Sequence, residues 1–457
     1  MTNRPRKKGV NYAPWERVFD KILTPFEEFI HRQTTSGLLL MICAVVALFL
    51  ANGPFAQTYH NFISSYVGIT FGDWKLKMSL HHWVNDGLMV LFFFVVGLEL
   101  KRELLVGELA NPRNAILPIA AAVGGMVVPA LIYFAINPTG DNAIGWGIPM
   151  ATDIAFAIGA LALLASRVPK ALITFLVALA IVDDLGAVLV IAVFYTETIA
   201  LGPLAISAGL FGALVMLNMS GIRNAIPYFI ISGFLWYFML LSGVHATLAG
   251  ILGALTVPAL PKYDPDHFCG DVKSLMTRFR ASYQSNTDKT VMTNVELRAV
   301  VQTLANKVQS VQAPLQRLEH GWHMPVAYLV IPVFALVNAG IPLEFGSIAQ
   351  TMSHPIVMGV SLGLILGKFI GITGASWLVL KFGIADLPKN TRFTQIAGVS
   401  LLAGIGFTMS IFVAQLGFEG REDLLLLAKT GILMASLIAG ISGMVWLYVV
   451  SKVPNSD

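Results

Sequence analysis

The chain is a succession of uncharged, strongly apolar stretches, each about as long as a helix that crosses a lipid bilayer. Such a helix needs roughly 20 apolar residues. Of the 457 residues, 56% are apolar and only 12% are charged, well below the charged share of a soluble protein. This composition excludes a water-soluble fold and implies that the chain itself is a membrane domain.

We predict an all-α polytopic membrane protein with 12 transmembrane helices. The predicted spans are 36–52, 84–100, 115–136, 145–165, 171–195, 201–218, 226–242, 243–260, 323–342, 355–380, 395–417 and 424–450. They divide the chain into a basic N-terminal segment (1–35), eight spans within 36–260, an inserted loop (261–322), four spans within 323–450 and a tail (451–457).

Two segments between spans have patterns of their own. Residues 53–83 alternate apolar and polar side chains around Gly72 and Asp73, which predicts a short external β-hairpin. This hairpin is either a contact in a homodimer, which we favour, or a cap. In the inserted loop, apolar residues recur at helical spacing from Leu297 to Val311, which predicts a short amphipathic helix after a polar stretch.

The basic residues are sorted by side of the membrane. Twenty-five of the 30 Lys and Arg residues fall on the side of the N-terminus, three on the opposite side and two inside spans. Because basic loops stay in the cytoplasm, both termini are expected there. This sorting leaves no basic patch and argues against a nucleic-acid partner. The two cysteines, Cys43 and Cys269, form no disulfide framework.

Four charged side chains are predicted to lie mid-membrane: Asp153, Asp183, Asp184 and Lys368. Each opposes insertion by roughly 2.5 to 3.5 kcal/mol. A buried salt bridge would account for one pair, but three carboxylates against one lysine leave two negative charges in excess. The pattern therefore predicts a site that binds a cation, protons, or both in turn.

Two predicted spans contain helix-weakening residues at mid-membrane. The first runs from Gly145 to Asp153 through Pro149, and the second from Gly404 to Ser410. They cross the membrane in opposite directions, as do the interrupted helices of inverted-repeat transporters, and opened backbone offers oxygens to Na⁺. The alternative is two glycine kinks that serve packing alone.

Long motifs carry a resemblance to a known family. They are Asn85-Asp-Gly-Leu-Met, Gly97-Leu-Glu-Leu-Lys-Arg-Glu103, Ala151-Thr-Asp-Ile-Ala-Phe-Ala157, Ala178-Leu-Ala-Ile-Val-Asp-Asp-Leu-Gly186, Ser242-Gly-Val-His-Ala-Thr-Leu-Ala-Gly250, Arg317-Leu-Glu-His320, Gly367-Lys368 and Gly404-Ile-Gly-Phe-Thr-Met-Ser-Ile-Phe412. In this order they resemble the NhaA-type bacterial sodium/proton antiporters, from about residue 30 to 450.

The resemblance implies a secondary transporter, not an enzyme, in the bacterial inner membrane. It implies an inverted repeat with two discontinuous crossing helices, and electrogenic expulsion of Na⁺ or Li⁺ in exchange for protons, activated as the cytoplasm turns alkaline. No cofactor is expected, since Na⁺, Li⁺ and H⁺ are the substrates. The protein is expected to be embedded in the lipid bilayer.

The resemblance also implies roles for individual residues. Asp184 resembles the main cation-binding carboxylate, and Asp183 its neighbour paired with Lys368. Thr152 and Asp153 resemble residues at the helix crossing, where Asp153 compensates the facing helix dipoles. The residues that resemble a pH sensor are Glu99, Glu103, Glu319, His320 and His245.

The residues alone leave some of these roles open. Glu99 and Glu103 flank two basic residues at a helix end and are equally well read as an ordinary solvated charge cluster. His245 opens a span, where a hydrogen-bonded structural histidine is the simpler interpretation. Lys368 either releases a proton when Na⁺ arrives or only holds Asp183.

Two other functions were compared with exchange. A Na⁺-coupled symporter of an organic solute needs a polar or basic pocket, and the spans contain no further Arg or Asn cluster for one. An intramembrane aspartyl protease needs two aspartates on separate helices, and its Gly-x-Gly-Asp motif is missing. A P-loop is also missing, which argues against ATP as the energy source.

Overall fold

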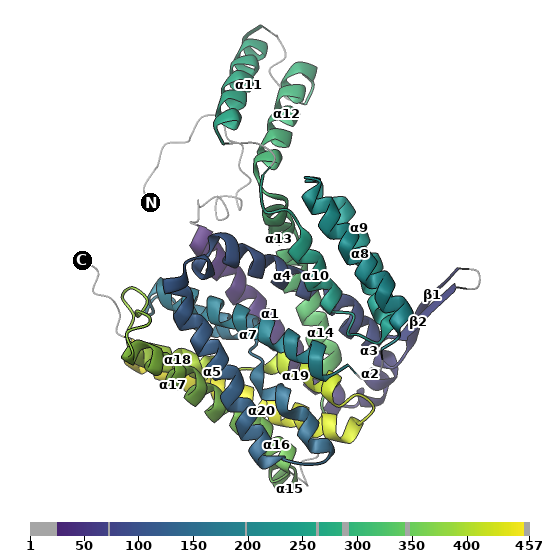
Figure 1. Ribbon diagram of the computed structural model, residues 1–457, viewed down its shortest axis with the longest axis vertical. Coiled ribbons are helices and arrows are strands. Elements are labelled where there is room, and N and C mark those ends of the chain that lie inside the picture. Colours follow the sequence, from purple (N-terminus) through teal and green to yellow (C-terminus); the bar gives the residue numbers. More distant parts are fainter. Residues whose placement is uncertain are drawn as a thin grey trace.

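The structure, a computed structural model, describes residues 25–71, 74–196, 199–261, 265–285, 292–342 and 348–451. Within these ranges it is predominantly helical, with one two-stranded sheet. The helices pack side by side into a bundle, from which a helical hairpin and a β-hairpin project (Figure 1). The predicted fold class, an all-α membrane protein with a small hairpin, is confirmed.

Most of the bundle consists of long apolar helices. The uninterrupted ones are α1 (Pro25–Asn52), α5 (Pro112–Ile136), α7 (Lys170–Phe194), α8 (Leu201–Met219), α9 (Ala225–Ser242) and α20 (Glu422–Val450). Three further stretches join α-helices through a wider π-helical turn: η2 (Trp83–Leu88) with α4 (Met89–Val106); α13 (Pro314–Pro325), η5 (Val326–Val330) and α14 (Ile331–Asn338); and α16 (Pro355–Leu362), η6 (Gly363–Gly367) and α17 (Lys368–Lys381).

Two stretches are broken in the middle. In the first, the 3₁₀ helix η4 (Asp141–Met150) is followed by three extended residues and then by α6 (Ile154–Leu163). In the second, α18 (Phe393–Leu402) and α19 (Phe407–Gly417) meet at an angle of 50°. Both breaks fall where Gly and Pro weaken the predicted spans.

Nine described helices are long and apolar enough to cross a membrane, or ten when α18 and α19 count as one span. The two predicted spans that this criterion leaves out are 84–100 and 243–260. The first corresponds to α4, whose 18 residues include four charged ones, and the second to α10 (Leu248–Thr256), which has only 9 residues. The count of twelve therefore stays a prediction.

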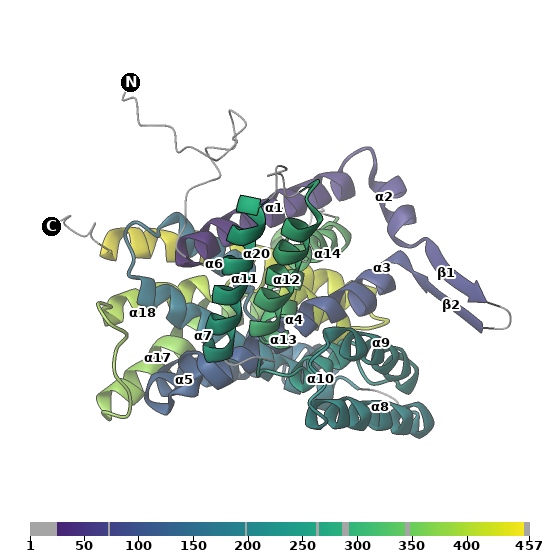
Figure 2. The same cartoon turned by 90° about the horizontal axis from the view of Figure 1, so that it is seen from above.

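The projecting hairpin consists of β1 (Tyr66–Phe71) and β2 (Trp74–Ser79), which pair antiparallel with Tyr66 opposite Ser79. It continues from the short helix α2 (Ala56–Ile63), leads into α3 (Leu80–His82) and extends beyond the bundle (Figure 2). The predicted hairpin in 53–83 is thus present, and its turn at residues 72–73 lies outside the described residues.

The predicted inserted loop (261–322) contains α11 (Pro265–Ser285) and α12 (Val295–Val311), which pack as an antiparallel pair (Figure 1), and most of α13, which begins before the predicted span at 323. The spacing from Leu297 to Val311 predicted α12, whereas α11 lies in the stretch expected to be a polar loop. Leu275 and Leu297 are buried in the hairpin, and Lys307 contacts Asp271 at 2.6 Å.

A stripe of small residues brings α5 close to the α16–η6–α17 stretch. Gly363 and Gly367 pack against Pro149 and Pro129, and the backbones of Gly371 and Gly124 touch. Close backbone approach at small residues is a main source of helix association in membranes. The stripe therefore fixes the rotation of α17, whose first residue is Lys368.

This packing yields a testable contrast on one helix. A side chain at Gly371 would collide with the Gly124 carbonyl, whereas a Cβ at Gly374 meets nothing within 4 Å. We expect Gly371→Val to lower the free energy of unfolding by about 1 to 3 kcal/mol or more, because overpacking forces the backbones apart. Thermal unfolding in detergent measures this, with Gly374→Val as the control of equal helix propensity. Equal melting temperatures for the two variants would show that the contact is not tight.

Candidate ion-binding site

The two broken stretches cross each other at their extended segments. The amide of Asp153 donates a hydrogen bond of 2.7 Å to the carbonyl of Ile405. Each broken stretch thus provides the hydrogen-bond partner for a backbone group that is left open in the other. Without water, every opened backbone group in a membrane needs such a partner. Polar side chains at the crossing therefore have a structural task, which is to satisfy the opened backbone groups.

Asp153 lies at the amino-terminal ends of two helices at once. Its Oδ1 accepts a hydrogen bond from the Phe156 amide in the first turn of α6. Its Oδ2 accepts bonds from the amide of Thr408 at 3.0 Å and from the hydroxyl of Thr408 at 2.6 Å, in the first turn of α19. Helix amino termini carry partial positive charge, so a single buried carboxylate offsets the dipoles of both helices.

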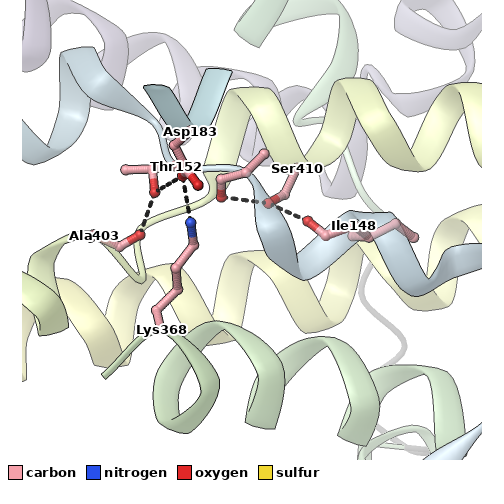
Figure 3. A network of polar contacts seen from close by, with 7 residues as sticks. Ile148, Thr152, Asp183, Lys368, Ala403 and Ser410 are labelled. Atoms are coloured by element: carbon pink, nitrogen blue, oxygen red, sulfur yellow. Dashed lines mark hydrogen bonds and ion pairs between the residues drawn. The ribbon is translucent and has the colours of Figure 1, made fainter. Parts of the chain in front are cut away.

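Lys368 reaches the crossing from η6 and α17 and pairs with Asp183 of α7 (Figure 3). The Lys368 ammonium lies 2.5 Å from Asp183 Oδ2, and both side chains are fully buried. The Thr152 hydroxyl lies 2.7 Å from the same carboxylate oxygen and 2.9 Å from the carbonyl of Ala403. Three elements that are distant in sequence are thus joined through one oxygen atom.

The hydroxyl of Ser410 completes this polar group on the side of η4. It donates to the carbonyl of Ile148 at 2.9 Å, and the carbonyl of Ala151 lies 3.4 Å away (Figure 3). The hydroxyl thus covers carbonyls at the end of the 3₁₀ helix. The crossing gathers hydroxyl, carbonyl and carboxylate oxygens, which are hard ligands suited to a cation such as Na⁺.

Asp184 differs from its neighbour in having no partner. It is fully buried, yet neither of its carboxylate oxygens forms a hydrogen bond with any residue that the structure describes. The Oδ1 of Asp183 is in the same condition. A buried carboxylate oxygen without a partner is costly, and these three oxygens mark the place where a cation or proton would bring the largest gain.

A second cluster of charges lies between α4 and α13. Arg102 lies 2.8 Å from Glu103 and 3.4 Å from Glu319, and His323 lies 3.5 Å from Glu99. The structure thus brings together three of the residues that resemble a pH sensor. His320 is not among them, because its side chain is exposed on the other face of α13, where it lines a pocket with Arg317.

His245 lies apart from this cluster, in the break between α9 and α10. Its Nε2 is 2.9 Å from the carbonyl of Tyr195. The hydroxyl of Tyr195 in turn donates to Ile144 and accepts from the amide of Gly147, both in η4. His245 therefore supports the half-helix that leads into the crossing.

Sequence reasoning did not select four residues that the structure places in these groups. Thr408 and Ser410 lie in the second broken span but were not named as site residues. A hydroxyl side chain next to a predicted helix break could have identified both. His323 follows Glu319 by four residues, the spacing of neighbours on one helix face. Arg102 lies between Glu99 and Glu103 in the sequence, and this position could have identified it as a cationic partner of the glutamates.

Comparison with known proteins decides the class of protein. The family described as Na⁺/H⁺ antiporter 1 matches residues 27–447. The chain is 54% identical over 453 residues to a Na⁺/H⁺ antiporter NhaA 1 of Saccharophagus degradans, covering 98% of this chain and 97% of that one. It is 51% identical over 444 residues to a Na⁺/H⁺ antiporter NhaA of Sulfurimonas denitrificans, covering 97% and 99%.

The chain belongs to the NhaA family of Na⁺/H⁺ antiporters. A third relative, from Syntrophobacter fumaroxidans, is 49% identical over 444 residues, covering 97% of this chain and 94% of that one. The predicted resemblance is thus confirmed, and so is the predicted class of function, sodium/proton antiport. These relatives are named as transporters and not as enzymes. The NhaA family membership covers both broken stretches and the helices that carry Asp183 and Lys368.

The Asp153–Thr408 contact gives a prediction on stability. Thr408→Val removes the hydroxyl while nearly preserving shape, and one oxygen of a buried carboxylate then loses a partner. The backbone amide of Thr408 still donates to this oxygen, so we expect the free energy of unfolding to fall by about 1.5 to 3 kcal/mol, as for loss of one hydrogen bond to a charged group. Thermal unfolding in detergent measures the loss. Thr408→Ser, which keeps the hydroxyl, should retain most of the stability, and equal losses in both variants would contradict the assignment.

Proposed function

We propose that Asp183 and Asp184 bind Na⁺ or protons in turn, with Thr152, Asp153 and Lys368 completing the exchange site. The observation that carries the proposal is the unpaired carboxylate of Asp184, buried beside the Lys368–Asp183 pair. Among the described residues, no three His, Cys, Asp or Glu side chains converge as a metal site. The cation's other ligands are then hydroxyl and carbonyl oxygens of the crossing.

Exchange follows from competition for the same oxygens. A proton bound to a carboxylate removes the charge that attracts the cation, so a single site holds Na⁺ or protons but not both. Two protons bind for each Na⁺ that leaves, one on Asp184 and one on Lys368, which then pairs with the ionised Asp183; this moves net charge and makes the exchange electrogenic. Li⁺ is a second substrate of the same oxygens, since it is an equally hard monovalent cation.

Lys368 contributes to this cycle through its pairing with Asp183. While the pair is intact, Asp183 has its charge largely offset and Asp184 is the stronger attractor for a cation. When Na⁺ binds to both carboxylates, it weakens the ion pair between Asp183 and Lys368. The desolvated Lys368 ammonium then releases its proton more readily. Lys368 as proton carrier and Lys368 as holder of Asp183 are successive stages in this account.

Asp153 has a different part. Its oxygens are occupied by the two helix amino termini, so it stabilises the broken helices and leaves Asp183 and Asp184 to bind the ion. Thr152 joins the two groups, because it follows η4 in the chain and contacts Asp183. Movement of either broken helix therefore alters the ligands of the site directly.

We further propose that the cluster around Arg102 and His323 activates the protein as the cytoplasm turns alkaline. Three carboxylates lie there beside the Arg102 guanidinium and the His323 imidazole, and a change of charge within this group changes how α4 and α13 attract each other. Here His323 takes the part first assigned to His320. His245 acts separately, through Tyr195 and η4.

The orientation and assembly also belong to the proposal. The sorting of basic residues supports both termini in the cytoplasm and a place in the bacterial inner membrane. A sheet edge that projects from the bundle supports a homodimer through the 53–83 segment, since unpaired edges accept a second strand. Segments 1–35 and 451–457 then lie in the cytoplasm, together with the inserted loop at 261–322.

The central test replaces one carboxylate. Asp184→Asn preserves shape but removes the charge that competes for Na⁺ and H⁺, so we expect Na⁺-induced dequenching of a pH dye in everted vesicles to be abolished. Asp386→Asn, which neutralises an exposed loop carboxylate, is the matched control and should leave exchange intact. Near-normal exchange by Asp184→Asn at equal protein content would overturn the assignment.

Competition also predicts a dependence on pH. As pH falls, protons occupy the carboxylates and the apparent KM for Na⁺ should rise, by about tenfold per pH unit for one competing proton and about a hundredfold for two, by mass action. Measuring KM for Na⁺ at several pH values in reconstituted vesicles gives the slope and hence the number of protons. A KM that stays constant as pH falls would exclude shared oxygens.

A further inference from the structure

The half of the first broken stretch that precedes the crossing is an unusually long 3₁₀ helix. Runs of this helix rarely exceed three or four residues, because its hydrogen bonds are poorly aligned. Helix η4 nevertheless extends over 10 residues, from Asp141 to Met150. Pro149 favours it over an α-helix, since proline has no N–H to donate to the carbonyl of Gly145, four residues earlier. One proline acts on one turn only, so contacts with other elements must stabilise the rest of η4.

Three hydroxyl groups from three other elements bind carbonyls of η4. The one nearest the crossing is that of Ser410 in α19 (Figure 3). Tyr133 of α5 donates to the carbonyl of Asn142 at 2.7 Å. Tyr195, which caps the end of α7, donates to the carbonyl of Ile144 at 2.8 Å. Because these carbonyls accept bonds from outside the helix, the shape of η4 depends on its neighbours.

The hydroxyl of Tyr195 differs from the other two because it bridges a donor and an acceptor of the same turn. It donates to the carbonyl of Ile144 and accepts a hydrogen bond of 3.2 Å from the amide of Gly147. These two backbone groups are three residues apart, which is the spacing of the bonded pair in a 3₁₀ helix. A hydroxyl that binds both members of the pair therefore fixes this turn of η4 from the side.

Two glycines leave room for the buried side chain of Tyr195. A Cβ at Gly147 would lie 2.7 Å from the Tyr195 hydroxyl oxygen, which is closer than such atoms approach in proteins. A Cβ at Gly417, at the end of α19, would lie 3.1 Å from the ring carbon Cε1 of the same tyrosine. Tyr195 is thus packed against both η4 and α19, the two half-helices that also contact each other.

Helix α7 holds the η4 stretch at two points. At its end, Tyr195 binds η4 as described, and the ring of Phe194 lies edge-on to that of Trp146 in η4, with 5.1 Å between ring centres. In its middle, Asp183 accepts the hydroxyl of Thr152, which follows η4. The two points are about 18 Å apart, since 12 residues of an α-helix separate Asp183 from Tyr195. A change in the length of η4 therefore displaces Thr152 relative to Asp183.

We propose that Tyr195 is a positioning residue for the cation site. This rests on the proposed function, in which oxygens at the crossing bind the cation together with Asp183 and Asp184. Tyr195 does not touch the ion. Its hydroxyl holds η4 at the length that places Thr152 against Asp183, and so sets the affinity of the site for Na⁺. His245, whose Nε2 lies 2.9 Å from the Tyr195 carbonyl, acts on the site through the same residue.

Removing one hydroxyl tests the positioning role. Tyr195→Phe keeps the ring, but the carbonyl of Ile144 and the amide of Gly147 lose their common partner. We expect KM for Na⁺ to rise about tenfold, the equivalent of two ordinary hydrogen bonds, while the maximal exchange rate per folded protein changes less than about twofold. Na⁺-dependent exchange in reconstituted vesicles at one pH measures both quantities. A loss of folded protein alone would lower the maximal rate and leave KM unchanged.

Two further tyrosines provide a graded comparison. Tyr228 is the matched control, because it is fully buried and its hydroxyl donates to the carbonyl of Ile222 at 2.9 Å, between α8 and α9 and outside the crossing. Tyr228→Phe should lose comparable stability and leave KM for Na⁺ within about twofold of its original value. Tyr133→Phe removes one hydrogen bond from η4 instead of two, so KM should rise about threefold.

A substitution in η4 reaches the same contact if Tyr195→Phe does not fold. In Gly147→Ala the new Cβ displaces the Tyr195 hydroxyl, so KM for Na⁺ should rise as it does for Tyr195→Phe. An unchanged KM in these variants, or an equal rise in Tyr228→Phe, would overturn the positioning role and leave the proposed function standing. Absence of Na⁺-dependent exchange by the unsubstituted chain would instead overturn the proposed function.

Discussion

The structure depends on how two opened helices satisfy their backbone groups without water. A helix break in a membrane leaves amides and carbonyls unpaired, and each costs several kcal/mol in hydrocarbon. Here the breaks cross, so that Asp153 and Ile405 pair through the backbone and the Asp153 carboxylate caps both α6 and α19. Since Thr152 and Ser410 cover the carbonyl ends, almost every opened group finds a partner. Among the described residues, what remains unpaired beside the crossing is the carboxylate of Asp184 and one oxygen of Asp183.

The small-residue stripe between α5 and α17 is the second condition for this site. Lysine is long, but its ammonium reaches Asp183 only if α17 lies close and turns its first residue inward. Backbone contact of Gly371 with Gly124 gives the closeness, and the packing of the whole stripe sets the rotation. Packing far from the carboxylates thereby determines the distance between two charges, which is why glycines and site residues share one stretch of sequence.

Sequence alone predicted those features whose cost is local. Charges in an apolar run and glycines in a span are unfavourable wherever the run packs, so Asp153, Asp183, Asp184 and Lys368 stood out, as did both breaks. Features decided by tertiary contacts could not be predicted in this way. Helix α11 has too polar a sequence to signal a packed helix, and α10 is too short to be a span by itself. That His323 and not His320 lies beside Glu99 depends on which face of α13 meets α4, and the pattern of a half-polar helix does not specify that face.

Adjacent carboxylates explain why one lysine suffices. Neighbouring residues on a helix diverge by about 100°, so Asp183 and Asp184 cannot both face Lys368. One is paired and the other is not, and a cation that bridges them must draw Asp183 away from its partner. A second lysine could pair with Asp184 and would leave no carboxylate for an ion. On the proposed mechanism, the unbalanced charge is therefore a condition for transport and not a defect of packing.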